Sequence, residues 1–161
     1  MISSLERTAY HEAGHAACSL RLGLLFDVVS VKPEGNTLGH IMMDDVFDIR
    51  QKRANATKRS MIAYAGFASE ILFCEDADES LDGASSDFGQ IVDELMNAFE
   101  NSADVDRRID QIAVNTYRLL RRSSTLALVT ALANALIEKE TLTFDEAIEI
   151  AITTAETGGV A

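Results

Sequence analysis

Residues 11 to 15 read His-Glu-Ala-Gly-His, and this stretch fits the pattern H-E-x-x-H. On an α-helix, residues four apart lie one above the other on the same face. Two imidazoles placed that way can share one metal ion, and nitrogen ligands completed by a carboxylate oxygen suit Zn²⁺. Glu12 lies beside this face, where it can reach a metal-bound water as a general base without being a ligand. The stretch therefore predicts His11 and His15 as metal ligands and Glu12 as a base.

The sequence around the motif predicts the helix that the motif requires. Ser3 precedes Glu6 by three residues, which is the pattern of a capping box. Residues 5 to 22 contain no proline, and their apolar residues recur at helical spacing. Gly14 costs about 1 kcal/mol inside a helix, and our hypothesis is that another backbone packs closely against it. The alternative interpretation is a surface helix, about 4–22, that carries two histidines by coincidence.

Composition restricts the class of protein. The 161 residues suit one domain, residues 1–161, with a sizeable core. A hydrophobic fraction of 47% and a charged fraction of 25% are typical of a globular protein rather than a disordered one. The net charge of −12 argues against nucleic acid or anionic lipid as a partner, because phosphate groups require a basic surface.

The sequence contains no targeting signal that we can identify. No apolar run reaches the roughly 18 residues of a spanning helix, so we expect no membrane insertion. The first residues lack the pattern of a signal peptide. Cys18 and Cys74 do not make a disulfide framework, and we expect a reducing, cytoplasmic setting. No G-x-x-x-x-G-K-[ST] stretch is present, so the chain is expected to have no P-loop ATPase of its own.

A β-hairpin is predicted after the first helix, at about residues 26–43. Residues 26–32 read as a strand rich in valine, and residues 38–43 read as a second strand. Between them, residues 33–36 read Pro-Glu-Gly-Asn, the strongest turn signal in the sequence.

The rest of the chain, about residues 50–156, is predicted to be helical, apart from an acidic loop at 75–86. The predicted helices are residues 50–73, 87–99, 104–122, a fifth from Ser123 or Ser124 to Lys139, and a sixth that begins at a Thr143–Glu146 capping box. The expected fold class is therefore mostly α, with about six helices and one small β-hairpin after the first helix.

A catalytic zinc site needs a third protein ligand and one open position for water. His40 is the only other histidine, and we interpret it as an ordinary residue of the second strand. Cys18 shares a helix face with His11 and His15. However, ligands at i, i+4 and i+7 spread over roughly 10 Å and cannot converge on one ion. Cys18 is therefore read as a small buried apolar residue.

Two carboxylates remain as candidates for the third ligand. Asp87 is expected to open a helix, and it can equally be a helix cap, with Gln90 completing a capping box. Glu70 lies on an otherwise apolar helix face, where a carboxylate is costly unless it is paired. It can be a ligand, or it can accept the free N–H of a ligating histidine. Spacing alone does not decide between Asp87 and Glu70.

Several segments resemble one known family. Residues 8–17, Thr-Ala-Tyr-His-Glu-Ala-Gly-His-Ala-Ala, resemble the zinc-binding helix of the FtsH-type metalloprotease domain. Residues 29–43 resemble the hairpin that follows in that family, and residues 65–71 resemble its Gly-Gly-x-x-Ala-Glu helix. Residues 82–87 resemble its Thr-Gly-Ala-x-x-Asp segment, whose aspartate is the third zinc ligand. Residues 136–142 resemble its late Leu-x-Glu-Lys-Glu-Thr-Leu helix end, so the resemblance covers nearly the whole chain in order.

This resemblance implies a zinc metallopeptidase of the H-E-x-x-H type with one Zn²⁺ per chain. Its ligands would be His11, His15 and Asp87, with Glu12 as the base. Glu70 would lie close to the site without being a ligand.

The sequence also departs from the family. Members normally carry a membrane anchor and an AAA+ ATPase module ahead of this domain, and we find neither pattern in this sequence. Asp82 stands where the family has threonine, which adds negative charge near the proposed site. Ala65 replaces the first glycine of the Gly-Gly pair. None of these changes removes a ligand or the base.

We therefore expect a zinc-dependent endopeptidase that acts, without its own ATPase, on unfolded or flexible polypeptides. The edge of the second strand, Leu38, Gly39, His40 and Ile41, is a candidate for holding an extended peptide by β-augmentation. Polypeptide substrates and a separate ATPase or unfoldase are the expected partners. The family works as a hexameric ring, so a homo-oligomer is a further expectation.

Two other interpretations remain. The domain can bind zinc as a regulatory or partner module with little or no proteolysis, although such a role does not need Glu12. The third interpretation is a helical domain that holds no metal.

Overall fold

The structure is a computed structural model that describes residues 2–32, 49–74, 81–99 and 101–158. Most of these residues are helical, and two short strands form an antiparallel pair. The elements are α1 (Ser4–Leu22), β1 (Val28–Ser30), α2 (Ile49–Phe73), α3 (Leu81–Ala98), α4 (Ser102–Leu120), α5 (Ser123–Lys139), β2 (Thr141–Thr143) and α6 (Phe144–Gly158). The expected fold class is confirmed. Among the described helices, none combines the length and the apolar character that a membrane span requires.

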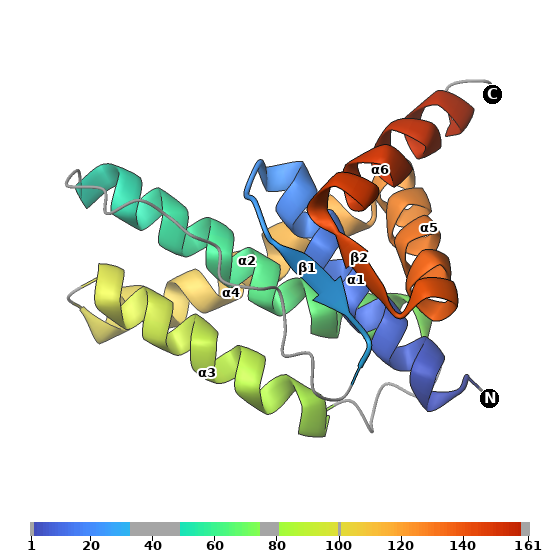
Figure 1. Ribbon diagram of the computed structural model, residues 1–161. Coiled ribbons are helices and arrows are strands. Elements are labelled where there is room, and N and C mark those ends of the chain that lie inside the picture. The colour runs from blue at the N-terminus through green and yellow to red at the C-terminus, as the bar shows by residue number, and fades with distance from the viewer. Residues whose placement is uncertain (1, 33–48, 75–80, 100, 159–161) are drawn as a thin grey trace.

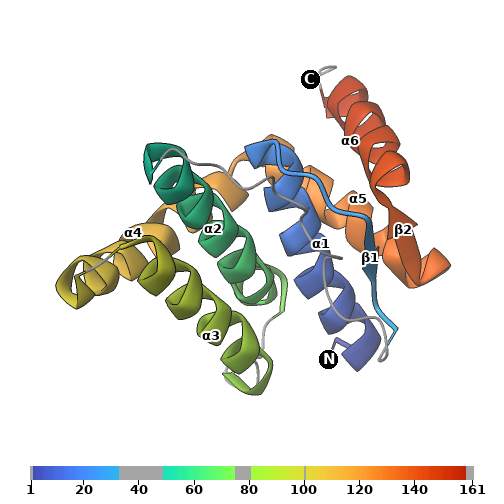
Figure 2. The ribbon, with the colours of Figure 1, turned by 60° about the vertical axis from the view of Figure 1, so that its left-hand side comes forward.

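Helix α1 lies at the centre of the molecule, between α2 and α5 (Figure 1; Figure 2). Helices α3 and α4 pack against α2, and α6 packs against α5. The buried residues of α1 are Ala9 and residues 13–19, and all except His15 are small, so neighbouring helices can approach its backbone. The predicted capping box forms at its start: the Ser3 hydroxyl accepts the Glu6 N–H, and the Glu6 carboxylate accepts the Ser3 N–H.

Strand β1 confirms the strand predicted after the first helix, but its described partner was not predicted. It pairs with β2 from near the other end of the chain, so that Val29 lies opposite Leu142. The predicted second strand of the hairpin, residues 38–43, lies outside the described residues. Glu140 ends α5 in a left-handed conformation with φ 64°, and its carbonyl accepts the Val31 N–H at 2.9 Å. These bonds hold the end of α5 against the strand that follows α1.

The start of α3 corrects one prediction. The Asp-Gly-Ala-Ser-Ser composition indicated a loop up to residue 86 and a helix beginning at Asp87, whereas the helix begins at Leu81. Asp87 therefore lies inside the helix and is not its cap. A loop-like composition is only a weak local preference, and α3, which is anchored by the fully buried Ile91 and Leu95, continues through it.

Smaller shifts occur at the later helices. Helix α4 spans Ser102–Leu120 rather than 104–122, because Asn101 caps it by accepting the Ala103 N–H. The N-cap of α5 is Arg122, which makes no side-chain cap, so the predicted cap at Ser123 or Ser124 is wrong. The capping box of α6 is confirmed, since the Thr143 hydroxyl accepts the Glu146 N–H and the Glu146 carboxylate accepts the Thr143 N–H.

We predict that Leu142→Ala lowers the free energy of unfolding by about 2–5 kcal/mol, because it removes a fully buried side chain from the β1–β2 pair. Leu25→Ala is the matched control, since Leu25 is 63% exposed and should cost far less. Urea denaturation of the two variants measures the difference. Equal destabilisation would contradict the role given to β2.

Candidate metal centre

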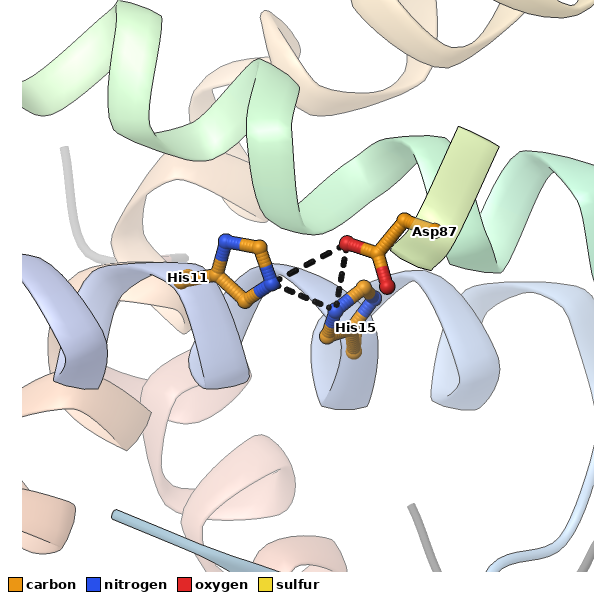
Figure 3. A group of neighbouring side chains, drawn as sticks. All are labelled: His11, His15 and Asp87. Atoms are coloured by element: carbon orange, nitrogen blue, oxygen red, sulfur yellow. Dashed lines mark hydrogen bonds and ion pairs between the residues drawn. The ribbon is translucent and has the colours of Figure 1, made fainter. Parts of the chain in front are cut away.

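Helices α1 and α3 bring three predicted ligands together. His11 and His15 come from consecutive turns of α1, and Asp87 points toward them from α3 (Figure 3). The two Nε2 atoms lie 3.0 Å apart, and Asp87 Oδ2 lies 3.2 Å from His11 Nε2 and 3.6 Å from His15 Nε2. All three side chains are largely buried. Among the described residues, this is the group of His, Cys, Asp and Glu side chains able to hold a metal ion.

Hydrogen bonds on the far side of each ring decide which nitrogen faces the centre. His15 Nδ1 lies 2.7 Å from the Ile62 carbonyl oxygen, which can only accept, so Nδ1 carries the proton. His11 Nδ1 lies 2.5 Å from Glu70 Oε1 and donates to that carboxylate. In the neutral rings, Nε2 then carries a lone pair on both histidines. Histidines that bind metals are oriented in this way.

The three facing atoms fit a metal ion. Two lone pairs and a carboxylate oxygen at such short separations repel one another unless a positive charge lies between them. In a tetrahedral zinc site with bonds of about 2.0–2.2 Å, ligand atoms are separated by roughly 3.3–3.5 Å. The observed separations of 3.0, 3.2 and 3.6 Å lie around this value. Asp87 Oδ2 is buried and has no hydrogen-bond partner, which suits an atom that binds a cation.

Glu70 contacts His11 from α2. It lies on α2 and is 5% exposed, and its contact with His11 is through Nδ1, on the side of the ring away from the centre. Of the two carboxylates that spacing could not separate, Asp87 thus lies with the two Nε2 atoms and Glu70 lies behind His11.

Gly14 of α1 and Gly66 of α2 let the two helices approach closely and leave space for the histidine rings. A Cβ added to Gly66 would lie 2.5 Å from His15 Nε2 and 2.6 Å from His11 Nε2. A Cβ added to Gly14 would lie 2.5 Å from the Ala65 carbonyl oxygen and would clash with the Ser69 side chain. The hypothesis that Gly14 allows another backbone to pack closely is therefore confirmed. Because α1 and α2 run in opposite directions, Glu70 meets His11 while Ile62 meets His15.

Glu12 has the properties of a proton acceptor beside this centre. Its Oε2 atom is buried and has no hydrogen-bond partner. Burial raises the pKa of Glu12 to about 7; the positive charge of His11 opposes this shift, and the negative charges of Asp87 and Glu70 add to it. The carboxylate is therefore close to half-protonated near neutral pH.

The two histidines bind protons very differently when no metal is bound. Burial by itself would lower the pKa of His11, but the adjacent carboxylates of Asp87 and Glu70 outweigh burial and raise it to about 10. Burial, followed by the positive charge of His11, lowers the pKa of His15. A proton at neutral pH therefore resides on His11, and a metal ion must displace it.

Cys18 does not belong to this group of ligand atoms. Cys18 is fully buried in α1, and burial raises the pKa of its thiol to about 12, as expected for an apolar core residue. Residues 38–41, which include His40 and the predicted substrate strand, lie outside the described residues. The Asp82 side chain is likewise not described.

Two contributions to the site were not predicted from the sequence. The Ile62 carbonyl that orients His15 leaves no signal in the sequence, because any residue supplies a backbone carbonyl. The role of Gly66 had a signal: a glycine in the middle of a long predicted helix is unfavourable and often marks close packing.

Comparison with known proteins gives no family for this chain. No protein-family model matches the sequence, and no curated protein matches it. The resemblance to the FtsH-type domain therefore remains an expectation from the motifs.

We predict that Gly66→Ala weakens metal binding at least about tenfold, because the added methyl group must displace one or both Nε2 atoms by several tenths of an ångström. Gly89→Ala in α3 is the matched control, since a Cβ there meets nothing within 4 Å. Competition with a zinc chelator measures both affinities. Equal affinity in the two variants would show that Gly66 does not shape the site.

We also predict that the apparent metal affinity rises with pH. Because His11 has a raised pKa of about 10, metal binding below this pH releases its proton, and the affinity should increase about tenfold per pH unit between pH 7 and 9. Chelator competition, corrected for the protonation of the chelator itself, measures this slope. A pH-independent affinity over this interval would contradict the assignment of the proton to His11.

Proposed function

We propose that the chain is a zinc-dependent endopeptidase that cleaves unfolded or flexible polypeptides. The observation that carries this proposal is the Oε2 atom of Glu12, which is buried without a hydrogen-bond partner on the residue that directly follows a candidate ligand. An unpaired buried carboxylate oxygen is costly, and neither metal binding by the other residues nor folding requires it. Burial raises the pKa of Glu12 above its ordinary value, which makes this carboxylate a stronger base for the proton of a water molecule.

The donor set favours zinc among the common metals. Two imidazole nitrogens and one carboxylate oxygen match the three-ligand sets of catalytic zinc sites, which keep a fourth position open. When bound, zinc would lower the pKa of a water molecule and polarise a peptide carbonyl. His11, His15 and Asp87 would hold the ion.

The other residues would transfer the proton and orient the two histidines. Glu12 would take the proton of the attacking water at its carboxylate and return it to the leaving peptide nitrogen. Glu70 would keep His11 oriented by accepting its Nδ1–H, and the Ile62 carbonyl would do the same for His15. Both hydrogen bonds also make the Nε2 atoms better electron-pair donors to the metal ion.

We further propose that the chain belongs with the FtsH-type peptidase domains. The ligand set that this family implies, His11, His15 and Asp87, is the set whose atoms converge, and the position of Glu70 behind His11 agrees with its implied role. These contacts support the proposal, which rests on motifs that the sequence carries in order.

Substrate delivery is part of the same proposal. Flexible or partly degraded polypeptides would reach the site unaided, and a separate ATPase would be needed for folded ones. The strand suggested for holding the peptide, residues 38–41, lies outside the described residues and stays a prediction. A reducing, cytoplasmic setting is supported by Cys18 and Cys74, which are both buried and unpaired.

We predict that the purified, zinc-loaded chain hydrolyses an unfolded protein such as reduced casein, and that Glu12→Gln lowers the rate at least about 100-fold by removing the base. The substitution keeps the shape of the side chain, so the variant should keep its fold and its zinc. Fluorescence of labelled casein measures the rate, and metal analysis measures the zinc content.

Asp93→Asn is a useful control, because Asp93 is an exposed carboxylate on α3 outside the site. It should cleave at the native rate. If Glu12→Gln cleaves as fast as the native chain, Glu12 is not the base. If neither chain cleaves although zinc is bound to both, the proposal of a self-sufficient peptidase is wrong, and the site either needs a partner or a ring or has the regulatory zinc-binding role.

A further inference from the structure

The end of helix α4 carries a hollow that the metal centre does not use. It has a volume of about 560 Å³, and we call it the arginine hollow. Its lining residues are Ala113, Val114, Tyr117, Arg118, Arg121 and Arg122. They come from the last turns of α4 and the turn into α5, whereas the metal ligands come from α1 and α3.

Among the described residues, the three arginines of the hollow have no acidic partner. All three are exposed, and no carboxylate of the described residues lies within ion-pair distance of them. Other arginines do find such partners: Arg59 pairs with Glu94 at 3.2 Å, and Arg107 pairs with Asp104 at 3.0 Å. The chain contains 26 Asp and Glu residues against 14 Lys and Arg, so unpaired arginines are unexpected here.

Apolar side chains form the floor between these charges. Val114 is 56% exposed, although it lies among side chains that prefer water. The ring of Tyr117 packs edge-on against Tyr64 of α2, with 5.9 Å between the ring centroids, which fixes its position. Tyrosine and arginine around a small apolar floor are the side chains that contribute most to protein interfaces.

The helix dipole accounts for only part of this arrangement. A cation in the last turn of a helix is favoured by about 0.3–1 kcal/mol, which explains Arg118. It does not explain an exposed valine beside it. Two further cations lie where the end of α1 meets the start of α5. Arg21 donates to the Ser124 carbonyl, and Lys58 donates to the Leu22 carbonyl.

We propose that the arginine hollow docks an acidic segment of a partner protein, with one apolar side chain seated on Val114 and Tyr117 and carboxylates facing the arginines. Complementary charge selects an acidic occupant, and the apolar floor selects a polypeptide rather than a phosphate backbone. The net charge of −12 repels nucleic acid or an anionic membrane more strongly than a short acidic segment, because these polyanions carry far more charge. This surface is independent of the proposed peptidase, since it uses none of its residues.

A display library of random short peptides tests the proposal without assuming a sequence. The library is selected on the full chain after depletion on the double variant Arg118→Glu with Arg121→Glu. We expect the surviving peptides to combine Asp or Glu with Leu, Phe or Ile. No selective peptides, or peptides without acidic residues, would overturn the proposal.

Fluorescence anisotropy then compares one enriched peptide across variants. The double variant should bind it at least about tenfold more weakly than the native chain, because two attractive charges become repulsive. Lys52→Glu with Arg107→Glu changes the net charge equally on exposed residues outside the hollow and should bind within about twofold of the native chain.

Val114→Ser separates the apolar contact from the charges. It should weaken binding at both low and high salt, whereas the effect of the arginines should shrink as salt rises. If the Arg118→Glu, Arg121→Glu variant and the Lys52→Glu, Arg107→Glu variant lose peptide affinity equally, the peptide responds only to the overall charge of the chain, and the proposal is overturned. Tighter binding of a single-stranded oligonucleotide or of phosphatidylglycerol vesicles than of the peptide would also overturn it.

Discussion

The two hydrogen bonds at the outer nitrogens of His11 and His15 are the constraint on which the site depends. The Ile62 carbonyl belongs to the backbone of α2 and can only accept, so the fold itself fixes the proton on His15 Nδ1. Glu70 does the same for His11 through a buried carboxylate. Both Nε2 atoms must then face each other at 3.0 Å, a spacing that two lone pairs tolerate only with a positive charge between them.

This constraint also explains the packing of the helices. For α2 to present a carbonyl to His15 and a carboxylate to His11, it must lie unusually close to α1, and Gly14 and Gly66 remove the side chains that would prevent this. Each glycine costs about 1 kcal/mol in helix propensity. The small buried residues of α1 recover part of this through close contacts with α2 and α5. The two glycines therefore lower the stability of their own helices but allow the close packing that the site requires.

Local features of the fold were predictable from the sequence, and distant pairings were not. The first helix and its capping box follow from residues within one turn of each other, so Ser3 and Glu6 sufficed. The pairing of β1 with β2 joins residues over 100 positions apart, and nothing local indicates it. For the third ligand, composition placed a loop before Asp87, whereas α3 begins at Leu81 and packs against α2. Only that packing decides which carboxylate, Asp87 or Glu70, lies beside the Nε2 atoms.

The charges around the centre favour a divalent ion over a proton. Asp87 and Glu70 lie against His11, and Glu12 follows it, so up to three carboxylates surround the imidazole pair. A single proton on His11 leaves this largely buried group with a net negative charge, and buried net charge is costly. A divalent cation would balance two carboxylates and leave the third, Glu12, beside the ion without a balancing charge. The residue expected to move a proton is therefore the one that the metal leaves unbalanced.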